Sequence, residues 1–147
     1  MKVLYRTLFF LHALIGIGAM AGGMAPILDP VSPIGISVDA LKNSPFDNFL
    51  IPGIILFTVI GLGNVIGAVT TCFKSKYQGY ISGTLGGALV IWIVVQCIML
   101  RAVVFLHVLF FILGIIQAAL AVVILFNKRM FPANLVIGFY NRMRKEA

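Results

Sequence analysis

Long uncharged stretches, separated by short groups of charged residues, dominate the pattern along the chain. The uncharged stretches are 7–28, 48–73, 77–100 and 102–127. Each is apolar on all sides and reaches the roughly 20 residues with which an α-helix crosses about 30 Å of hydrocarbon. Barrel strands are excluded, because they are about 10 residues long and alternate in polarity. We therefore predict an all-α fold, a bundle of four transmembrane helices. The expected spans are about 5–27, 46–72, 79–100 and 103–126.

The longest connection is the loop at about 28–44, which contains several prolines. Connections longer than about 12 to 15 residues usually have a function or some structure of their own. Ser37 is expected to cap one short turn, Val38 to Lys42, with Leu41 turned inward. The second span is expected to begin just after this loop, because Ser44-Pro45-Phe46-Asp47 has a capping residue, then proline, then an acid.

A helix that begins there places Pro52 in its interior, where the ring removes one backbone hydrogen bond and clashes with the preceding turn. We therefore predict a bend near Pro52-Gly53. The third and fourth spans are separated by little more than Leu100-Arg101-Ala102, which predicts a tight antiparallel hairpin.

The end of the chain, 132–146, has an amphipathic pattern. Leu135, Phe139 and Met143 share one helical face, and basic residues such as Arg142 lie opposite. This predicts a C-terminal interfacial amphipathic helix on the membrane surface, with its cations toward anionic lipid. The alternative is a disordered basic tail.

Composition and charge strengthen the membrane assignment and add an orientation. Of the 147 residues, 61% are hydrophobic and 10% are charged, which excludes a soluble globular protein. Nine of the 11 Lys and Arg residues lie on one side of the predicted spans, and Lys42 and Arg101 lie on the other. Because cations accumulate on the cytoplasmic side, both termini are expected to be cytoplasmic. The net charge of +7 then reflects topology and attraction to anionic lipid, and nucleic acid is not needed to explain it.

Small residues recur four apart in every predicted span. Such spacing lets helix backbones approach closely in a membrane. We expect these glycines to pack the bundle internally, with a dimer interface as the alternative. The helix-packing candidates are Gly18, Gly22, Gly63, Gly67, Gly79, Gly83, Gly87 and Gly114.

Polar residues within the spans fall into two layers. His12, Asn64 and Gln117 are expected in the inner third, where hydrogen bonds between three spans would serve mainly as packing. Gln96, Arg101 and His107 are expected near the outer end. Together with the outward-facing Asp29, Asp39 and Asp47, they are candidates for a headgroup or anion pocket. The alternative is that Arg101 reaches lipid phosphate and the aspartates are solvated.

Enzyme chemistry finds little support in this set of residues. The two histidines are expected on opposite sides of the midplane, which argues against a shared haem. No HExxH or paired-carboxylate motif is present, and a metal hydrolase built on His107 and the aspartates lacks ligands. The uncharged spans also lack the acidic or basic residue typical of ion-coupled transport. We expect a non-enzymatic protein with no cofactor and no metal site.

One local sequence is specific enough to suggest relatives. It comprises Gly22-Gly23, Leu28-Asp29-Pro30, Ile34-Gly35 and the continuous run from Ser44 to Gly53. This segment resembles small bacterial four-helix integral membrane proteins with a Ser-Pro-Phe-x-(Asp/Asn)-Phe-Leu-Ile-Pro-Gly signature. The resemblance implies a bacterial cytoplasmic (inner) membrane location and an outward-facing signature loop. It supplies no activity to transfer.

Two functional hypotheses follow from the sequence. In the first, the outer loop and bent second helix bind a lipid headgroup or a partner membrane protein. The surface would include Asp29, Asp39, Phe46, Asp47, Pro52, Gln96, Arg101 and His107. In the second, several copies assemble through their glycines into a channel or facilitator for a small solute. Membrane lipids, including anionic lipid at the cytoplasmic tail, are expected partners of either.

Overall fold

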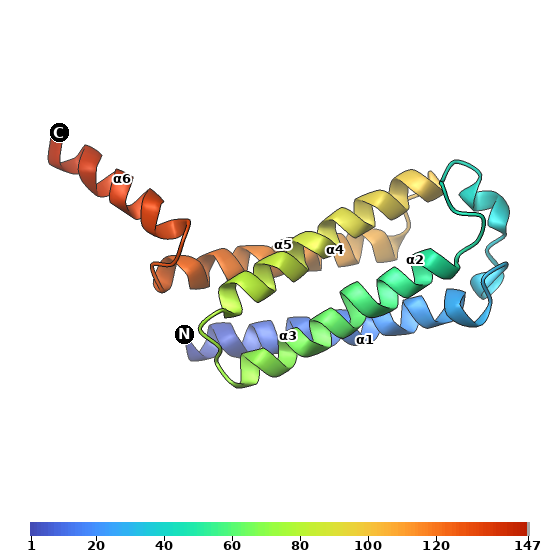
Figure 1. Ribbon diagram of the computed structural model, residues 1–147, viewed down its shortest axis with the longest axis horizontal. Helices are drawn as coiled ribbons and strands as arrows, with labels where there is room; N and C mark the ends of the chain where they lie inside the picture. The colour runs from blue at the N-terminus through green and yellow to red at the C-terminus, as the bar shows by residue number, and fades with distance from the viewer. Residues whose placement is uncertain (147) are drawn as a thin grey trace.

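Four long helices lie side by side in the computed structural model, which describes residues 1–146 (Figure 1). They are α1 (Lys2–Leu28), the continuous span formed by α2 (Leu50–Ile55), η3 (Leu56–Leu62) and α3 (Gly63–Cys72), then α4 (Gln78–Leu100) and α5 (Phe105–Asn127). All four are long and apolar enough to cross a membrane, as predicted. Within residues 1–146 every regular element is helical. The prediction of an all-α fold with four helices able to span a membrane is therefore confirmed.

The helices pack mainly in two pairs. α1 lies along α2, η3 and α3, and α4 lies along α5, with residues 101–104 as the turn between them. The predicted hairpin is thus present, and Arg101 ends α4 in the left-handed region at a φ of 48°. The last helix, α6 (Ala133–Glu146), extends away from the bundle in Figure 1.

The loop between α1 and α2 is a folded cap over one end of the bundle. It contains two short 3₁₀ helices, η1 (Pro33–Gly35) and η2 (Val38–Leu41). The Ser37 hydroxyl accepts a hydrogen bond from the Asp39 backbone N–H at 3.2 Å, and Leu41 is only 2% exposed. Leu41 packs with Phe49 and with Met99 of α4. The predicted capped turn with Leu41 inward is confirmed.

The start of the second span differs from the prediction. Residues 44–49 form bends, and α2 begins at Leu50 rather than at Pro45. Pro52 therefore lies in the first turn, where a backbone N–H has no acceptor within the helix. The lack of an N–H in proline costs nothing there. A helix from Pro45 would place the ring against the Asn48 carbonyl, whereas here the Asn48 side chain accepts from the Leu50 N–H at 3.0 Å. The prediction that Pro52 lies in the helix interior is wrong.

The irregular part of this span lies one turn later, in the π-helical segment η3. The Thr58 hydroxyl donates to the Ile54 carbonyl at 2.7 Å, and the Asn64 amide donates to the Ile60 carbonyl at 2.8 Å. Segments of this kind are rare and usually short. Here η3 packs along α1 and directly precedes Asn64.

The new helix start gives a stability prediction that contrasts Asn48 with Ser44. Asn48→Ala removes the side-chain acceptor of the Leu50 N–H and should lower the free energy of unfolding by about 1 kcal/mol. Ser44→Ala should cost clearly less, because Ser44 bonds only within its own turn, at 3.3 and 3.5 Å to Phe46. Thermal unfolding in detergent compares the two variants. A larger loss for Ser44→Ala would contradict this helix start.

Candidate functional site

A buried polar network joins all four spans in the half of the bundle that contains the N-terminus. His12 of α1, Asn64 of α3, Ser82 of α4 and Gln117 of α5 each have 0% of their surface exposed. The His12 ring contacts Asn64 Oδ1 through Nδ1 at 2.8 Å and Ser82 Oγ through Nε2 at 2.9 Å. The Gln117 amide donates to Asn64 Oδ1 at 3.1 Å. The structure thus brings together the three inner residues that the sequence singled out.

One arrangement of protons satisfies the two contacts that the His12 ring makes with Asn64 and Ser82. The Asn64 amide group is oriented by the Ile60 carbonyl, so Asn64 Oδ1 faces His12 and Nδ1 must be the donor. In a neutral ring Nε2 is then the acceptor, and the Ser82 hydroxyl donates to it. Gln78 Nε2 donates in turn to Ser82 Oγ at 3.0 Å. The result is a continuous chain of hydrogen bonds from Gln78 to Asn64.

Ser82 and Gln78 are members that the sequence reasoning missed. Both are fully buried on α4. The signal available in the sequence was their four-residue spacing, which places two polar residues on one face of the third predicted span. Gly67 also contributes, because a Cβ there would lie 2.5 Å from His12 Cε1. The space for the imidazole therefore depends on this glycine.

Two acceptors in the network have no donor among the described residues, namely Oε1 of Gln78 and Oε1 of Gln117. A buried acceptor without a donor costs free energy, because the low-dielectric interior offers it no water. The described residues contain no group of three or more His, Cys, Asp or Glu side chains placed to hold a metal. The hydrogen bonds of the network link side chains from all four spans.

Among the outer candidates, only His107 lines the groove between α4 and α5. His107 borders an apolar groove of about 370 Å³ between α4 and α5, together with Cys97, Ile98, Phe111 and their neighbours. None of the three aspartates, nor Gln96 or Arg101, lines that groove. The His107 ring instead accepts the Val104 backbone N–H at 3.4 Å, at the start of α5. The polar pocket that would unite these residues therefore stays a prediction, and this groove is not that pocket.

Two of the three aspartates make hydrogen bonds within the loop. Asp29 accepts the N–H groups of Val31 and Ser32 at 3.2 and 3.0 Å, and Asp39 pairs with Ser37 at 3.1 Å. Asp47 is exposed. Two other members of the predicted surface are at least partly covered: Pro52 is buried, and Phe46 packs against the Leu41 cluster.

The tip of the cap exposes a group of apolar side chains. Val31, Ile34 and Ile36 are 61%, 84% and 47% exposed. Ile34 has a φ of 54°, a left-handed conformation that is rare for a β-branched residue. We call these three residues the loop tip.

Most of the predicted glycines pack within the chain. A Cβ at Gly18, Gly22, Gly63, Gly67, Gly79, Gly83 or Gly114 would meet another side chain or backbone atom within 4 Å, whereas Gly87 faces open space. The tightest backbone approaches occur at other glycines. A Cβ at Gly23 would lie 2.7 Å from the Gly53 carbonyl oxygen, and one at Gly86 would lie 2.9 Å from that of Gly114.

Comparison of the chain with protein-family models, with curated proteins and with solved structures gave no match.

Proposed function

We propose that this chain is a non-enzymatic membrane protein that binds a partner membrane protein through its loop tip and the surrounding cap. In this proposal both termini are cytoplasmic, the cap lies outside a bacterial cytoplasmic membrane, and α6 rests on the inner leaflet. The charge distribution supports this orientation, because nine cations lie at one end of the bundle and two at the other.

The observation that supports the proposal is the combination of exposure and strain at Ile34. An L-residue in the left-handed region costs roughly 1–2 kcal/mol, and a β-branched side chain is especially disfavoured there. Asparagine or glycine would remove this cost. Ile34 combines this backbone strain with a side chain that is 84% exposed and packs against little of its own chain. This combination favours a role in contact with another molecule.

A protein partner fits this surface better than a lipid phosphate. The cap and hairpin end contains Asp29, Asp39 and Asp47 against the two cations Lys42 and Arg101, so it does not attract an anion. Arg101 is exposed on the hairpin and borders no described pocket with the aspartates. Exposed apolar residues next to charged ones are typical of protein interfaces.

Site-specific photo-crosslinking tests this proposal. A photoreactive residue at Val31, in the cells that naturally make the chain, should give one discrete protein adduct. Ile34→Asn should abolish that adduct without lowering the thermal stability of the chain, because asparagine tolerates the left-handed backbone. The matched control is Phe105→Asn, which changes another exposed apolar residue at the start of α5 and should leave the adduct intact.

Two results would overturn the proposal. One is labelling of lipid alone from position 31, which would place the loop tip in the bilayer surface. The other is an adduct that persists undiminished in the Ile34→Asn variant.

The alternative, an oligomeric channel or facilitator, receives less support. It requires glycine faces that are free to meet a second copy, and all of the predicted glycines except Gly87 meet atoms of their own chain. One open glycine is a small surface on which to assemble a pore.

A further inference from the structure

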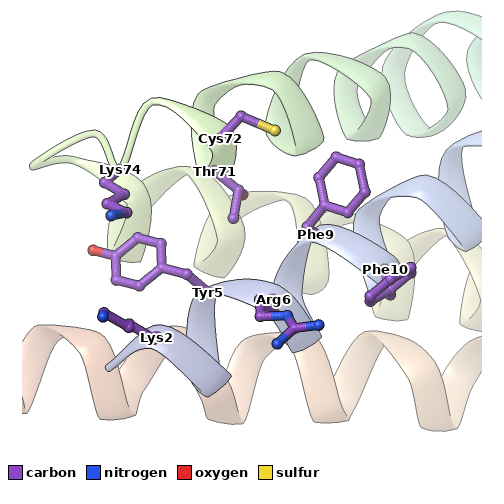
Figure 2. A pocket seen from close by; sticks show the side chains of 8 residues that line it. All are labelled: Lys2, Tyr5, Arg6, Phe9, Phe10, Thr71, Cys72 and Lys74. Carbon is purple, nitrogen blue, oxygen red and sulfur yellow. The ribbon is translucent and has the colours of Figure 1, made fainter.

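The end of the bundle opposite the cap contains a groove with an uneven distribution of charge. The groove, of about 390 Å³, lies between the first turns of α1 and the end of α3. Its lining residues are Lys2, Tyr5, Arg6, Phe9, Phe10, Thr71, Cys72 and Lys74. In Figure 2 the ammonium groups of Lys2 and Lys74 lie on either side of the Tyr5 ring, and Phe9 and Phe10 lie farther along α1.

The three cations of this groove lack anionic partners in the described chain. Lys2, Arg6 and Lys74 are exposed, and the three aspartates of the chain, Asp29, Asp39 and Asp47, all belong to the opposite end of the bundle. The region is therefore strongly electropositive. A ligand with negative charge is what this charge pattern attracts.

The position of Lys74 is fixed by its surroundings. Its backbone is left-handed, with a φ of 49°, and its N–H donates to the Thr71 carbonyl at 3.1 Å. The following residues are tied to the end of α5, because Lys128 Nζ donates to the carbonyls of Ser75 and Lys76 at 3.2 and 3.4 Å. Lys128 also lies 5.7 Å from the centre of the Tyr5 ring. The groove is thus formed before any ligand binds.

The apolar part of the groove identifies the class of ligand. From Lys2 to Phe10 the helix rises about 12 Å, which is the step from a membrane surface into its hydrocarbon. Phe10 is 66% exposed on the face of α1 that borders the groove. A soluble anion would use only the cations. A phospholipid would place its phosphate among the cations and an acyl chain against the phenylalanines.

We propose that this groove is a binding site for one anionic glycerophospholipid, with its phosphodiester held by Lys2, Arg6 and Lys74 and an acyl chain lying along Phe9 and Phe10. The site contains no residue of α6 or of the loop tip. The test of this site is therefore independent of the test of the proposed protein partner. Tyr5 lies between the two lysines, with its hydroxyl toward Lys74 (Figure 2).

Native mass spectrometry of the full chain with added phosphatidylglycerol tests this site. One phosphatidylglycerol should bind in preference to phosphatidylethanolamine. The variant Lys2→Gln, Arg6→Gln, Lys74→Gln should weaken its affinity roughly 100-fold, since each cation near anionic lipid contributes about fivefold. All three side chains are exposed, so the fold should be retained.

A second triple variant controls for net charge. Lys42→Gln, Lys76→Gln, Arg129→Gln removes the same charge from exposed positions that do not line the groove, and it should leave the affinity nearly unchanged. An equal loss in both triple variants would overturn the site in favour of general attraction to a basic surface. Phe10→Gln should weaken the affinity for phosphatidylglycerol severalfold. Displacement of the lipid by inorganic phosphate would instead show that a soluble anion is the ligand.

Discussion

Gly86→Ala is expected to destabilise the bundle by about 1–3 kcal/mol, although it adds a single methyl group. A Cβ at this position would lie 2.9 Å from both the Ala118 nitrogen and the Gly114 carbonyl oxygen. Those atoms belong to the backbone of α5, so they cannot move aside as a side chain could. The α4–α5 hairpin must open for the methyl group to fit.

The neighbouring residue provides the control. A Cβ at Gly87 has no atom within 4 Å, so Gly87→Ala should leave stability unchanged or raise it slightly through helix propensity. Both variants can be followed by reversible unfolding in mixed micelles, with fluorescence of Trp92, the single tryptophan, as the signal. Equal effects at the two positions would contradict the packing of α4 against α5.

His12→Leu is expected to cost about 2 kcal/mol, the second large effect. The change removes the hydrogen bonds to Asn64 and Ser82 and leaves the buried Ser82 hydroxyl without the ring nitrogen that accepts its proton. An orphaned buried group costs about 1–3 kcal/mol in proteins, and single hydrogen bonds between membrane helices contribute less than about 2. The same unfolding measurement applies.

The other histidine and a double variant complete this experiment. His107→Leu should cost less than about 1 kcal/mol, because that ring accepts only one backbone N–H, at 3.4 Å. His12→Leu combined with Asn64→Leu should cost less than the sum of the two single changes, since partners in one network are coupled. Strictly additive losses would show that the network does not act as a unit.

The sequence predicted those parts of the fold in which residues can be counted along a straight helix. Depth counted from the ends of the uncharged stretches placed His12, Asn64 and Gln117 in one layer, and these residues do meet. The same count does not reach Asp29, Asp39 and Asp47, because these residues lie on a folded loop outside the four long helices. Within this loop, Asp29 accepts a hydrogen bond from the Ser32 N–H, and Asp39 accepts one from the Ser37 hydroxyl.

Spacing alone was a poor guide to which glycine faces a neighbouring helix. The four-residue period selected Gly79, Gly83 and Gly87, yet the glycine of α4 that faces the α5 backbone most closely is Gly86. Adjacent residues differ by about 100° around a helix, and the period does not reveal which of them is turned toward the partner. The start of α2 shows a related limit. The pattern at Ser44 resembles a helix start, but Pro52 is compatible with a helix only when that helix begins later.

The π-helical segment η3 has a consequence for how related sequences would align with this one. A π-turn holds one residue more than an α-turn, so residues before and after η3 follow different helical phases. Pro52 and Gly53 are the buried residues before η3, and Asn64, Gly67 and Thr71 are buried residues after it. A relative with an ordinary α-turn here would keep the same inward residues with one fewer between them. A single-residue gap in this span would therefore mark a conserved arrangement of side chains rather than a divergent one.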